Sequence, residues 1–396
     1  MKYYSTNHTA PLASLHEAVV RGLAPDRGLY MPERIRKLPA EFFNHIDSMS
    51  FQEIAYHVAD AFFGEDIPAD RLKQIVYDTL SFPCPVKPVE DRIFSLELFH
   101  GPTLAFKDVG ARFMARMLQY FIHEEGTKEV NVLVATSGDT GSAVANGFLG
   151  VDGIRVFVLY PKGKVSAIQE SQFTTLGQNI TAIEGDGVFD NCQALVKQAF
   201  MDDDLCHHMK LTSANSINLA RFLPQAFYYF HAYAQLKRMG KADNFVVCVP
   251  RGNFGNITAA IFARQMGLPI KRFIAANNAN DVVCQYLQTG EYAPRPSVQT
   301  IANAMDVGDP SNFARISDLD AHGACAYQAL KDLLADDEVG VFGETAHPAK
   351  FKETVESAIN AEIDIPERLA AFMKGKKQSV SMSKKFSDFK QLLMAE

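Results

Sequence analysis

The sequence predicts an α/β protein with open, mostly parallel sheets flanked by helices, preceded by a mainly helical N-terminal domain. In four places an apolar run is followed by a loop of small residues and an amphipathic stretch, within 130–149, 154–172, 245–266 and from 339 onward. Continuous apolar strands that alternate with helices are typical of parallel sheets covered on both faces. Before residue 86, apolar residues recur mainly at helical spacing.

The composition indicates an enzyme of the cytoplasm. The chain has 396 residues, 47% of them hydrophobic, and a net charge of -7, which argues against nucleic acid as a partner. No apolar run reaches bilayer length and no signal peptide is evident, so we expect no membrane association. The six cysteines form no C-x-x-C pair, which favours free thiols over a metal site.

The first 85 residues are expected to form the helical N-terminal domain. Helices are predicted near Leu15–Leu23 and Phe51–Phe63, separated by a loop over Ala24–Glu33 that contains proline and glycine. Ser81–Val89 contains three prolines and is expected to be an extended connector.

The catalytic region is therefore predicted to occupy residues 86–396. Within this region, a smaller subdomain of about 110–215 is expected to be inserted in the larger one. Near the end of the chain, the basic stretch Lys374–Lys385 is expected to be a solvated linker before a last helix.

Lys107 is the first residue that suggests chemistry. It follows a loop that contains Gly101 and Pro102, and Asp108 is expected to cap the helix that follows. That helix has a polar stripe and an apolar stripe, and Lys107 belongs to neither. A lysine in an apolar setting near a helix N-terminus is expected to have a lowered pKa and to serve as a nucleophilic amine.

The loop "TSGDTGS" (Thr136–Ser142) follows the next predicted strand and precedes a helix expected over Ala143–Leu149. Ser137, Thr140 and Ser142 could donate hydrogen bonds to a carboxylate or a phosphate. Asp139 would repel such an anion, so it is expected to lie near a phenolic or cationic group.

Two later segments predict anion binding. In "PRGNFGN" (Pro250–Asn256), Gly252 and Gly255 permit unusual backbone conformations and a helix N-terminus follows, which favours phosphate. The loop lacks the G-K-[ST] of a nucleoside triphosphate site. In "NSINLAR", Asn218 and Arg221 are three residues apart and are expected on one helix face, as a fork for phosphate.

A reactive lysine and a phosphate loop on one sheet suggest pyridoxal phosphate, whose chemistry needs both. The chain also resembles the threonine synthase family, which has the pyridoxal-phosphate fold type II of the tryptophan synthase β chain. The resemblance covers nearly the whole chain and rests on these motifs: "AVVRGLAPDRGLYMPE", "LELFHGPTLAFKD", "ATSGDTG", "NSINLAR", "VPRGNFGN", "RFIAANNAND" and "TAHPAKF". Between Asn312 and His322 the chain is shorter than that family branch.

The resemblance assigns roles to individual residues. It makes Lys107 the residue that forms a Schiff base with pyridoxal 5'-phosphate, and it places Asp139 near the ring 3-oxygen and Thr345 at the pyridine nitrogen. A neutral hydroxyl there would leave that nitrogen unprotonated. The cofactor phosphate is assigned to Gly252, Asn253, Phe254, Gly255 and Asn256. The substrate is assigned to Ser137, Thr140, Lys164, Asn218 and Arg221.

The resemblance implies a carbon–oxygen lyase acting on phosphates. It would convert O-phospho-L-homoserine and water to L-threonine and phosphate, the last step of threonine biosynthesis. One alternative is a related pyridoxal-phosphate lyase or dehydratase that acts on hydroxy- or phospho-amino acids. A second is a non-catalytic ligand-binding protein on the same fold. We expect a monomer or a homodimer whose only partner is the small-molecule substrate.

Overall fold

The computed structural model describes two compact units. Unit 1 comprises Met1–Ala18, Leu23–Gly101 and Ser216–Thr345, and unit 2 comprises Val19–Gly22, Pro102–Asn215 and Ala346–Glu396. The residues that the structure describes are 1–126, 129–250, 252–298, 300, 305–319 and 334–395.

The main sheet of unit 1 has five strands, and all neighbouring pairs except the last are parallel. In spatial order they are β10 (Arg272–Ala276), β9 (Phe245–Pro250), β11 (Val339–Glu344), β4 (Ile93–Glu97) and β3 (Val86–Glu90). The expected connector over Ser81–Val89 is thus partly wrong, because its second half forms β3. Pro88 is tolerated there since β3 is an edge strand with an irregular register between Pro88 and Glu90.

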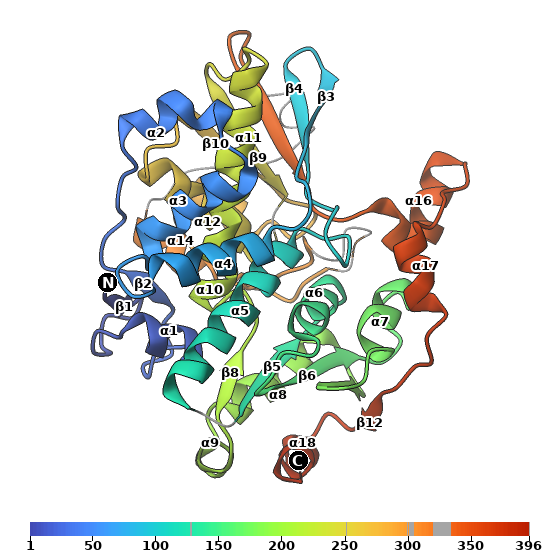
Figure 1. Cartoon of the computed structure of the whole chain (residues 1–396). Helices are drawn as coiled ribbons and strands as arrows, with labels where there is room; N and C mark the ends of the chain where they lie inside the picture. Colours follow the sequence, from blue (N-terminus) through green and yellow to red (C-terminus); the bar gives the residue numbers. More distant parts are fainter. Residues whose placement is uncertain (127–128, 251, 299, 301–304, 320–333, 396) are drawn as a thin grey trace. The chain divides into compact units, whose positions relative to one another are not determined.

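The helices of unit 1 surround this sheet, and α11 packs against both α3 and α12 (Figure 1). Helix α3 begins with a capping box between Ser50 and Glu53 and buries one apolar face, as its periodicity predicts. The helices are α2 (Ala40–His45), η1 (Ile46–Ser48), α3 (Phe51–Phe63), α4 (Ala69–Thr79), α10 (Leu219–Phe222), η2 (Leu223–Gln225), α11 (Ala226–Arg238), α12 (Gly255–Gln265), α13 (Val282–Thr289) and α14 (Phe313–Leu319).

The N-terminal region is less purely helical than expected. Besides α1 (Leu15–Arg21), it contains an antiparallel pair made by β1 (Tyr3–Ser5) and β2 (Tyr30–Pro32). The pair is closed by the predicted loop, in which Asp26 accepts hydrogen bonds from Ser5, Thr9, Ala10 and Gly28. Local periodicity finds the helices but does not reveal a three-residue strand pair.

The sheet of unit 2 is parallel throughout (Figure 1). Its spatial order is β12 (Val380–Met382), β7 (Ile180–Gly185), β6 (Ile154–Pro161), β5 (Val130–Ala135) and β8 (Leu211–Ser213). All six residues of β5 are buried, as expected of a strand covered on both faces. The predicted linker over Lys374–Lys385 is partly wrong, since it contains the edge strand β12.

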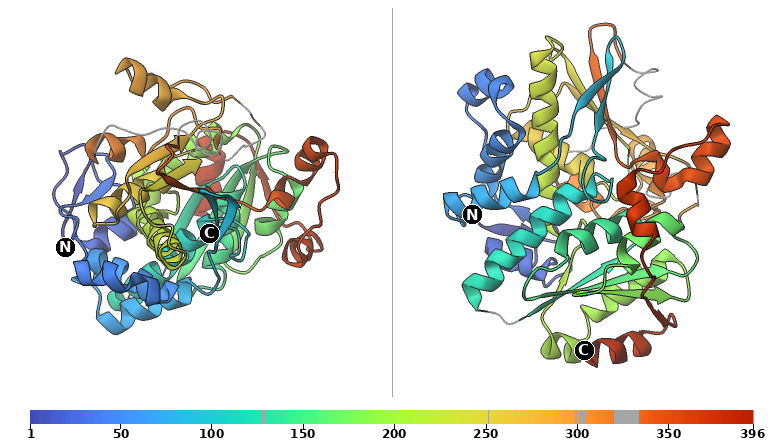
Figure 2. Two further views of the ribbon diagram at one scale, coloured as in Figure 1. Left: turned by 90° about the horizontal axis from the view of Figure 1, so that it is seen from above. Right: turned by 45° about the vertical axis from the view of Figure 1, so that its right-hand side comes forward.

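Helices cover both faces of this sheet, as the right-hand view of Figure 2 shows. One layer contains α5 (Lys107–Glu125), α6 (Asp139–Phe148) and α7 (Ala167–Thr174), and the other contains α8 (Phe189–Ala199), α9 (Asp203–His208) and α18 (Phe386–Met394). The remaining helices are η4 (Pro348–Phe351), α16 (Lys352–Ile359) and α17 (Glu367–Met373). The predicted α/β class with mostly parallel sheets is confirmed.

Helix α6 begins one turn earlier than the sequence predicts, at Asp139 instead of Ala143. The expectation placed Asp139 in a loop because glycine and polar residues are poor helix formers. In the structure, position 141 of α6 has to be a glycine, because a Cβ atom there would lie 2.5 Å from Thr136 Cγ2. Close packing has overridden propensity.

The described residues contain no group of histidine, cysteine and acidic side chains suited to a metal ion. Five cysteines are free thiols, of which Cys84, Cys192 and Cys248 are buried, while Cys325 lies outside the described residues. None of the described helices combines the length and apolarity that a membrane crossing requires.

Candidate active site

Lys107 is the first residue of α5 and is half-buried in unit 2. Its ammonium lies 5.6 Å from the centre of the Phe106 ring. The expected capping role of Asp108 is wrong, because Phe106 occupies the N-cap and Asp108 lies in the first turn. A short polar side chain beside a predicted helix start resembles a cap, and the sequence does not show that the helix begins two residues earlier.

Asp108 instead fastens the preceding loop to the helix. Its carboxylate accepts hydrogen bonds from the backbone N–H of Thr103 (2.8 Å) and from the Thr103 hydroxyl (2.7 Å). Burial raises the pKa of Asp108, and the two bonds from Thr103 oppose that shift. The arrangement fixes the start of α5 and therefore the position of Lys107.

Asp139 lies at the start of α6 and is buried in the same unit. Its Oδ1 atom lies 2.6 Å from Lys350 Nζ and accepts a hydrogen bond of 2.9 Å from Gln169 Nε2. Burial raises the pKa of Asp139, but the charges of Lys350 and Lys107 outweigh burial, so the pKa is lowered. The sequence predicts that Asp139 lies near a phenolic or a cationic group. In this structure the neighbouring group is the cationic side chain of Lys350.

Lys350 was missed by the sequence reasoning. It belongs to "TAHPAKF", from which only Thr345 was selected, and its ammonium is fully buried. A backbone bridge between Ala105 and Ala346 aligns this segment with the loop before α5, and Lys350 Nζ donates to Thr103 O at 3.0 Å. A lysine between apolar neighbours was the only available signal.

The loop before α6 is organised by Thr136. Its hydroxyl oxygen accepts hydrogen bonds from the N–H groups of Gly138 (2.9 Å) and Gly141 (2.7 Å). The Ser142 hydroxyl donates to Gly138 O at 3.1 Å, so its expected role as an anion donor is wrong. Ser137 and Thr140 are half-buried and remain candidates.

Lys164 lies farther along unit 2, in the loop that follows β6. Its side chain is exposed, unlike that of Lys107.

In unit 1, the predicted anion loop ends β9 and begins α12. Phe254 occupies the N-cap with φ of 62°, a left-handed conformation that is costly for a bulky residue and is often found at functional sites. The first amide groups of α12, at Gly255–Ile257, have no acceptor within the helix. A Cβ atom on Gly255 would lie 3.2 Å from the Ser216 Cβ atom, so the loop packs tightly against "NSINLAR".

Asn253 and Asn256 hold this loop in place. Asn253 Nδ2 donates to Ser216 Oγ at 3.1 Å, and the hydroxyls of Tyr228 and Tyr229 donate to Asn256 Oδ1 at 2.6 and 2.5 Å. The sequence reasoning missed both tyrosines, which belong to the apolar face of α11. Their pKa values lie well above the ordinary one because both are buried.

Asn256 Nδ2 is buried and has no hydrogen-bond partner among the described residues. A buried donor without a partner is costly, and it lies beside the amides of a helix N-terminus. This donor set is neutral and suits a phosphate group, so the residues present fit pyridoxal phosphate.

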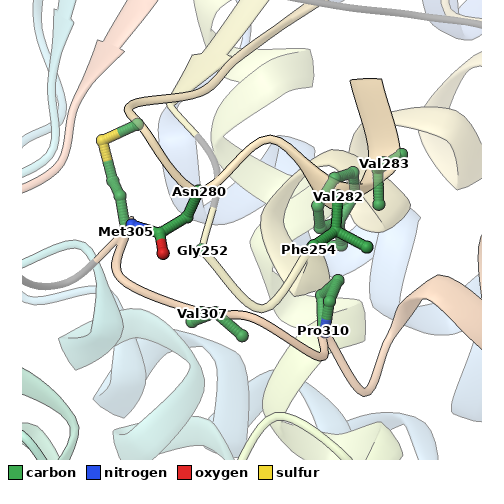
Figure 3. Close-up of a pocket in the computed structure, with 8 residues that line it drawn as sticks. All are labelled: Gly252, Phe254, Asn280, Val282, Val283, Met305, Val307 and Pro310. Atoms are coloured by element: carbon green, nitrogen blue, oxygen red, sulfur yellow. The ribbon is translucent and has the colours of Figure 1, made fainter. Parts of the chain in front are cut away.

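A small pocket lies against the same loop (Figure 3). Gly252 and Phe254 form one wall, and Asn280 contributes a polar group from the loop after β10. The remaining wall is apolar and consists of Val282, Val283, Met305, Val307 and Pro310.

The structure alters the expectation for "NSINLAR". Asn218 is the N-cap of the four-residue helix α10, and its Oδ1 accepts from Ala220 N at 3.0 Å, so it does not share a helix face with Arg221. Arg221 lies within α10 and is 2% exposed. Thr345 follows β11 and is half-buried.

Comparisons with known proteins give the class of this chain. The central part of the chain matches the family model "Pyridoxal-phosphate dependent enzyme" over residues 83–339. The model "Threonine synthase N terminus" matches residues 2–80, and "Threonine synthase, C-terminal" matches residues 321–393. The fold and these matches define a pyridoxal-phosphate-dependent enzyme.

The relatives identify the family more closely. The chain is 41% identical to threonine synthase of Serratia marcescens over 429 aligned positions, with 100% of this chain and 99% of the relative covered. It is 44% identical to threonine synthase of Haemophilus influenzae, with 93% and 94% covered. The chain therefore belongs to the threonine synthase family, as its motifs predict.

Solved structures lead to the same conclusion. The crystal structure of threonine synthase from Escherichia coli has a TM-score of 0.94, with 41% identity and full coverage of both chains. A pyridoxal-phosphate-bound threonine synthase from Brucella melitensis has a TM-score of 0.91 and 32% identity, with 100% of this chain and 99% of that chain covered. A threonine deaminase from Solanum lycopersicum shares only the fold, with a TM-score of 0.52 and 16% identity. The predicted activity class and cofactor are confirmed by these relatives.

Proposed function

We propose that this enzyme converts O-phospho-L-homoserine and water to L-threonine and phosphate. The observation that carries the proposal is the position of Lys107 at the start of α5, in the same unit as the ionised, buried Asp139. The neutral donors at the start of α12 support it, because they can bind a phosphate without a cationic side chain. Membership of the threonine synthase family supplies the substrate.

Pyridoxal phosphate, when bound, withdraws electrons from the substrate and so stabilises negative charge on its carbon atoms. Lys107 would hold the aldehyde carbon of the cofactor, Gly252–Asn256 its phosphate, Asp139 its 3-oxygen and Thr345 its pyridine nitrogen. These residues orient the cofactor and do not themselves carry the electronic part of the reaction.

The chain's own residues have two tasks. The amine of Lys107, released when the substrate binds, moves protons at Cα and Cβ as a general base and acid. Charged, hydroxyl and amide donors bind the substrate's carboxylate and phosphate, which fixes Cγ and its leaving group in place. These donors are Ser137, Thr140, Lys164, Asn218 and Arg221. The C–O bond at Cγ then breaks and phosphate leaves, Cγ takes up a proton in its place, and water adds as a hydroxyl at Cβ.

Product analysis tests this proposal. The purified holoenzyme is incubated with O-phospho-L-homoserine, and phosphate, threonine and 2-oxobutyrate are quantified together. Equal amounts of phosphate and threonine are expected. Phosphate with 2-oxobutyrate would instead indicate a dehydratase, and neither product would indicate a binding protein.

Substitution of the lysine provides the matched control. Lys107→Ala should abolish both turnover and the visible absorbance of the bound cofactor, because no amine remains to hold its aldehyde carbon. Lys73→Ala alters an exposed lysine of α4 and should retain both properties. Turnover retained in Lys107→Ala would contradict the assigned role.

We also propose that the enzyme works in the cytoplasm, as a monomer or a homodimer. The free thiols of the described cysteines support a reducing compartment. Light scattering coupled to size-exclusion chromatography would determine the mass of the particle, and a mass above that of two chains would contradict the proposed assembly.

A further inference from the structure

Lys350 has a constrained environment in unit 2. Its side chain is fully buried, and its ammonium is shared between Asp139 Oδ1 at 2.6 Å and Thr103 O at 3.0 Å. Thr103 O also accepts a hydrogen bond from Gln172 Nε2 at 3.0 Å, so this carbonyl does not depend on Lys350. The contact that depends on the charge of Lys350 is therefore its ion pair with Asp139.

The surrounding charges are arranged around two carboxylates. Asp139 interacts electrostatically with Lys350 and Lys107, and the buried Asp108 interacts with Lys350 and Arg112. A buried carboxylate without a cation is unfavourable and tends to take up a proton. Lys350 is the cation in direct contact with Asp139, whereas Lys107 has to be available for the cofactor.

We propose that Lys350 is a positioning residue for the reaction, which acts through Asp139 and has no contact of its own with the reacting atoms. The ion pair with Lys350 keeps the Asp139 carboxylate ionised and holds it in one orientation. The positive charge of Lys350 also offsets the negative charge of Asp139. The inference rests on the proposed roles of Lys107 and Asp139. Gln169, which donates to the same Oδ1 atom, completes the orientation of the carboxylate.

The inference predicts how the bound cofactor titrates. The nitrogen of Lys107, once linked to the cofactor, carries a proton whose loss changes the visible spectrum. In the wild-type enzyme the positive charge of Lys350 opposes that proton, whereas Asp139 favours it. Removal of Lys350 leaves the proton as the main cation facing Asp139, so the proton should be held more tightly.

The experiment is a spectroscopic pH titration of the holoenzyme. In Lys350→Met, the midpoint of the absorbance change should rise by about one pH unit relative to the wild type. Lys350→Arg keeps the charge and should titrate close to the wild type. In the Asp139→Asn background the Lys350→Met change should produce a smaller rise, because only the direct effect of the lysine charge remains once the carboxylate is gone.

Lys352→Met is the matched control, since this partly exposed lysine contacts Glu356 and the Ile363 carbonyl. It should titrate like the wild type. If Lys350→Met does not fold, Lys350→Gln, which keeps a donor for Thr103 O, is titrated with the same expectation.

A midpoint that is unchanged or lowered in the folded Lys350 variant would overturn the inference, and so would an equal rise in the Asp139→Asn background. The readout is independent of turnover. A rise without threonine formation would contradict the proposed function alone, and threonine formation without a rise would contradict the inference alone.

Discussion

Arg221 and Asn256 offer two chemically different ways to bind a phosphate in unit 1. Asn256 and the amides at the start of α12 are neutral, and the amide group of Asn256 is oriented by Tyr228 and Tyr229. Arg221 is charged and almost fully buried. Because the substrate and the cofactor each bring a phosphate, a division between neutral and charged donors would keep the two anions from competing.

This division predicts the effect of Arg221→Gln. The variant should keep the yellow colour of the cofactor but lose about 2–5 kcal/mol of interaction with the substrate, a decrease in kcat/KM of roughly 30- to several-thousand-fold. Steady-state phosphate release and absorbance spectra of the same preparation provide the two measurements.

Arg264→Gln is the control for that variant, because Arg264 is an exposed arginine near the end of α12. It should have wild-type colour and efficiency. A colourless Arg221→Gln protein with normal affinity for substrate would show that the two phosphate assignments are reversed.

At the residue scale, the sequence selects candidate positions but does not identify the side chains that contact them. Lys107, Asp139 and the Gly252–Asn256 loop follow predicted strands or begin helices, so local pattern was sufficient to select them. Lys350 contacts Asp139 from a segment far along the chain, and a single sequence contains no sign of such a contact. The contacts of Tyr228 and Tyr229 with Asn256 could not be predicted for the same reason.

At the element scale, the four apolar runs predicted as strands correspond to β5, β6, β9 and β11, because parallel strands buried on both faces are continuous apolar runs. The sequence did not predict β4, β7, β8 and β10, and it assigned the segments of β3 and β12 to a connector and a linker. β12 has three mainly exposed residues in a basic segment, and β3 contains a proline. Both are edge strands, whose sequences are under weaker constraint from the core.

The stability of the β1–β2 pair is predicted to depend on Asp26, in the loop that closes it. Asp26 accepts five hydrogen bonds, from the hydroxyls of Ser5 and Thr9 and from the N–H groups of Thr9, Ala10 and Gly28. Asp26→Ala should lower the free energy of unfolding by about 2 kcal/mol at neutral pH, a figure reduced for the partial exposure of this carboxylate. Denaturant unfolding measures the change.

The effect should depend on pH in a defined direction. Burial raises the pKa of Asp26, but the bonds to Ser5, Gly28, Thr9 and Ala10 outweigh it and hold the pKa well below the ordinary value of 3.8. The stabilisation is therefore present above that value and is lost as the pH falls below it. The difference between the two proteins should shrink below pH 3.8. Asp91→Ala, at an exposed site with a 3.4 Å pair to Lys241, should have little effect at any pH.

At the scale of the whole molecule, both units are assembled from segments that lie far apart in the sequence. Unit 2 needs residues 346–396 as well as 102–215, and unit 1 needs residues before and after that central part. The alternation of strands and helices predicted two kinds of layer, but it did not predict which distant segment completes which unit. Which segment completes which unit depends on contacts between distant elements, and such contacts cannot be inferred from the local pattern of a single sequence.

The last segment of the chain should therefore matter for the stability of unit 2 as much as the sheet itself does. β12 pairs with the edge of β7, and Phe389 and Leu393 of α18 are fully buried against residues of β5, β6, β7 and α8. Leu393→Ala should lower the free energy of unfolding by about 2–5 kcal/mol, because it removes buried apolar atoms and leaves a cavity between α18 and the sheet. Met394→Ala, one residue away and 40% exposed, should change it by less than about 0.5 kcal/mol. Equal denaturation midpoints for the two variants would show that α18 only lies on the surface of unit 2 and does not complete its core.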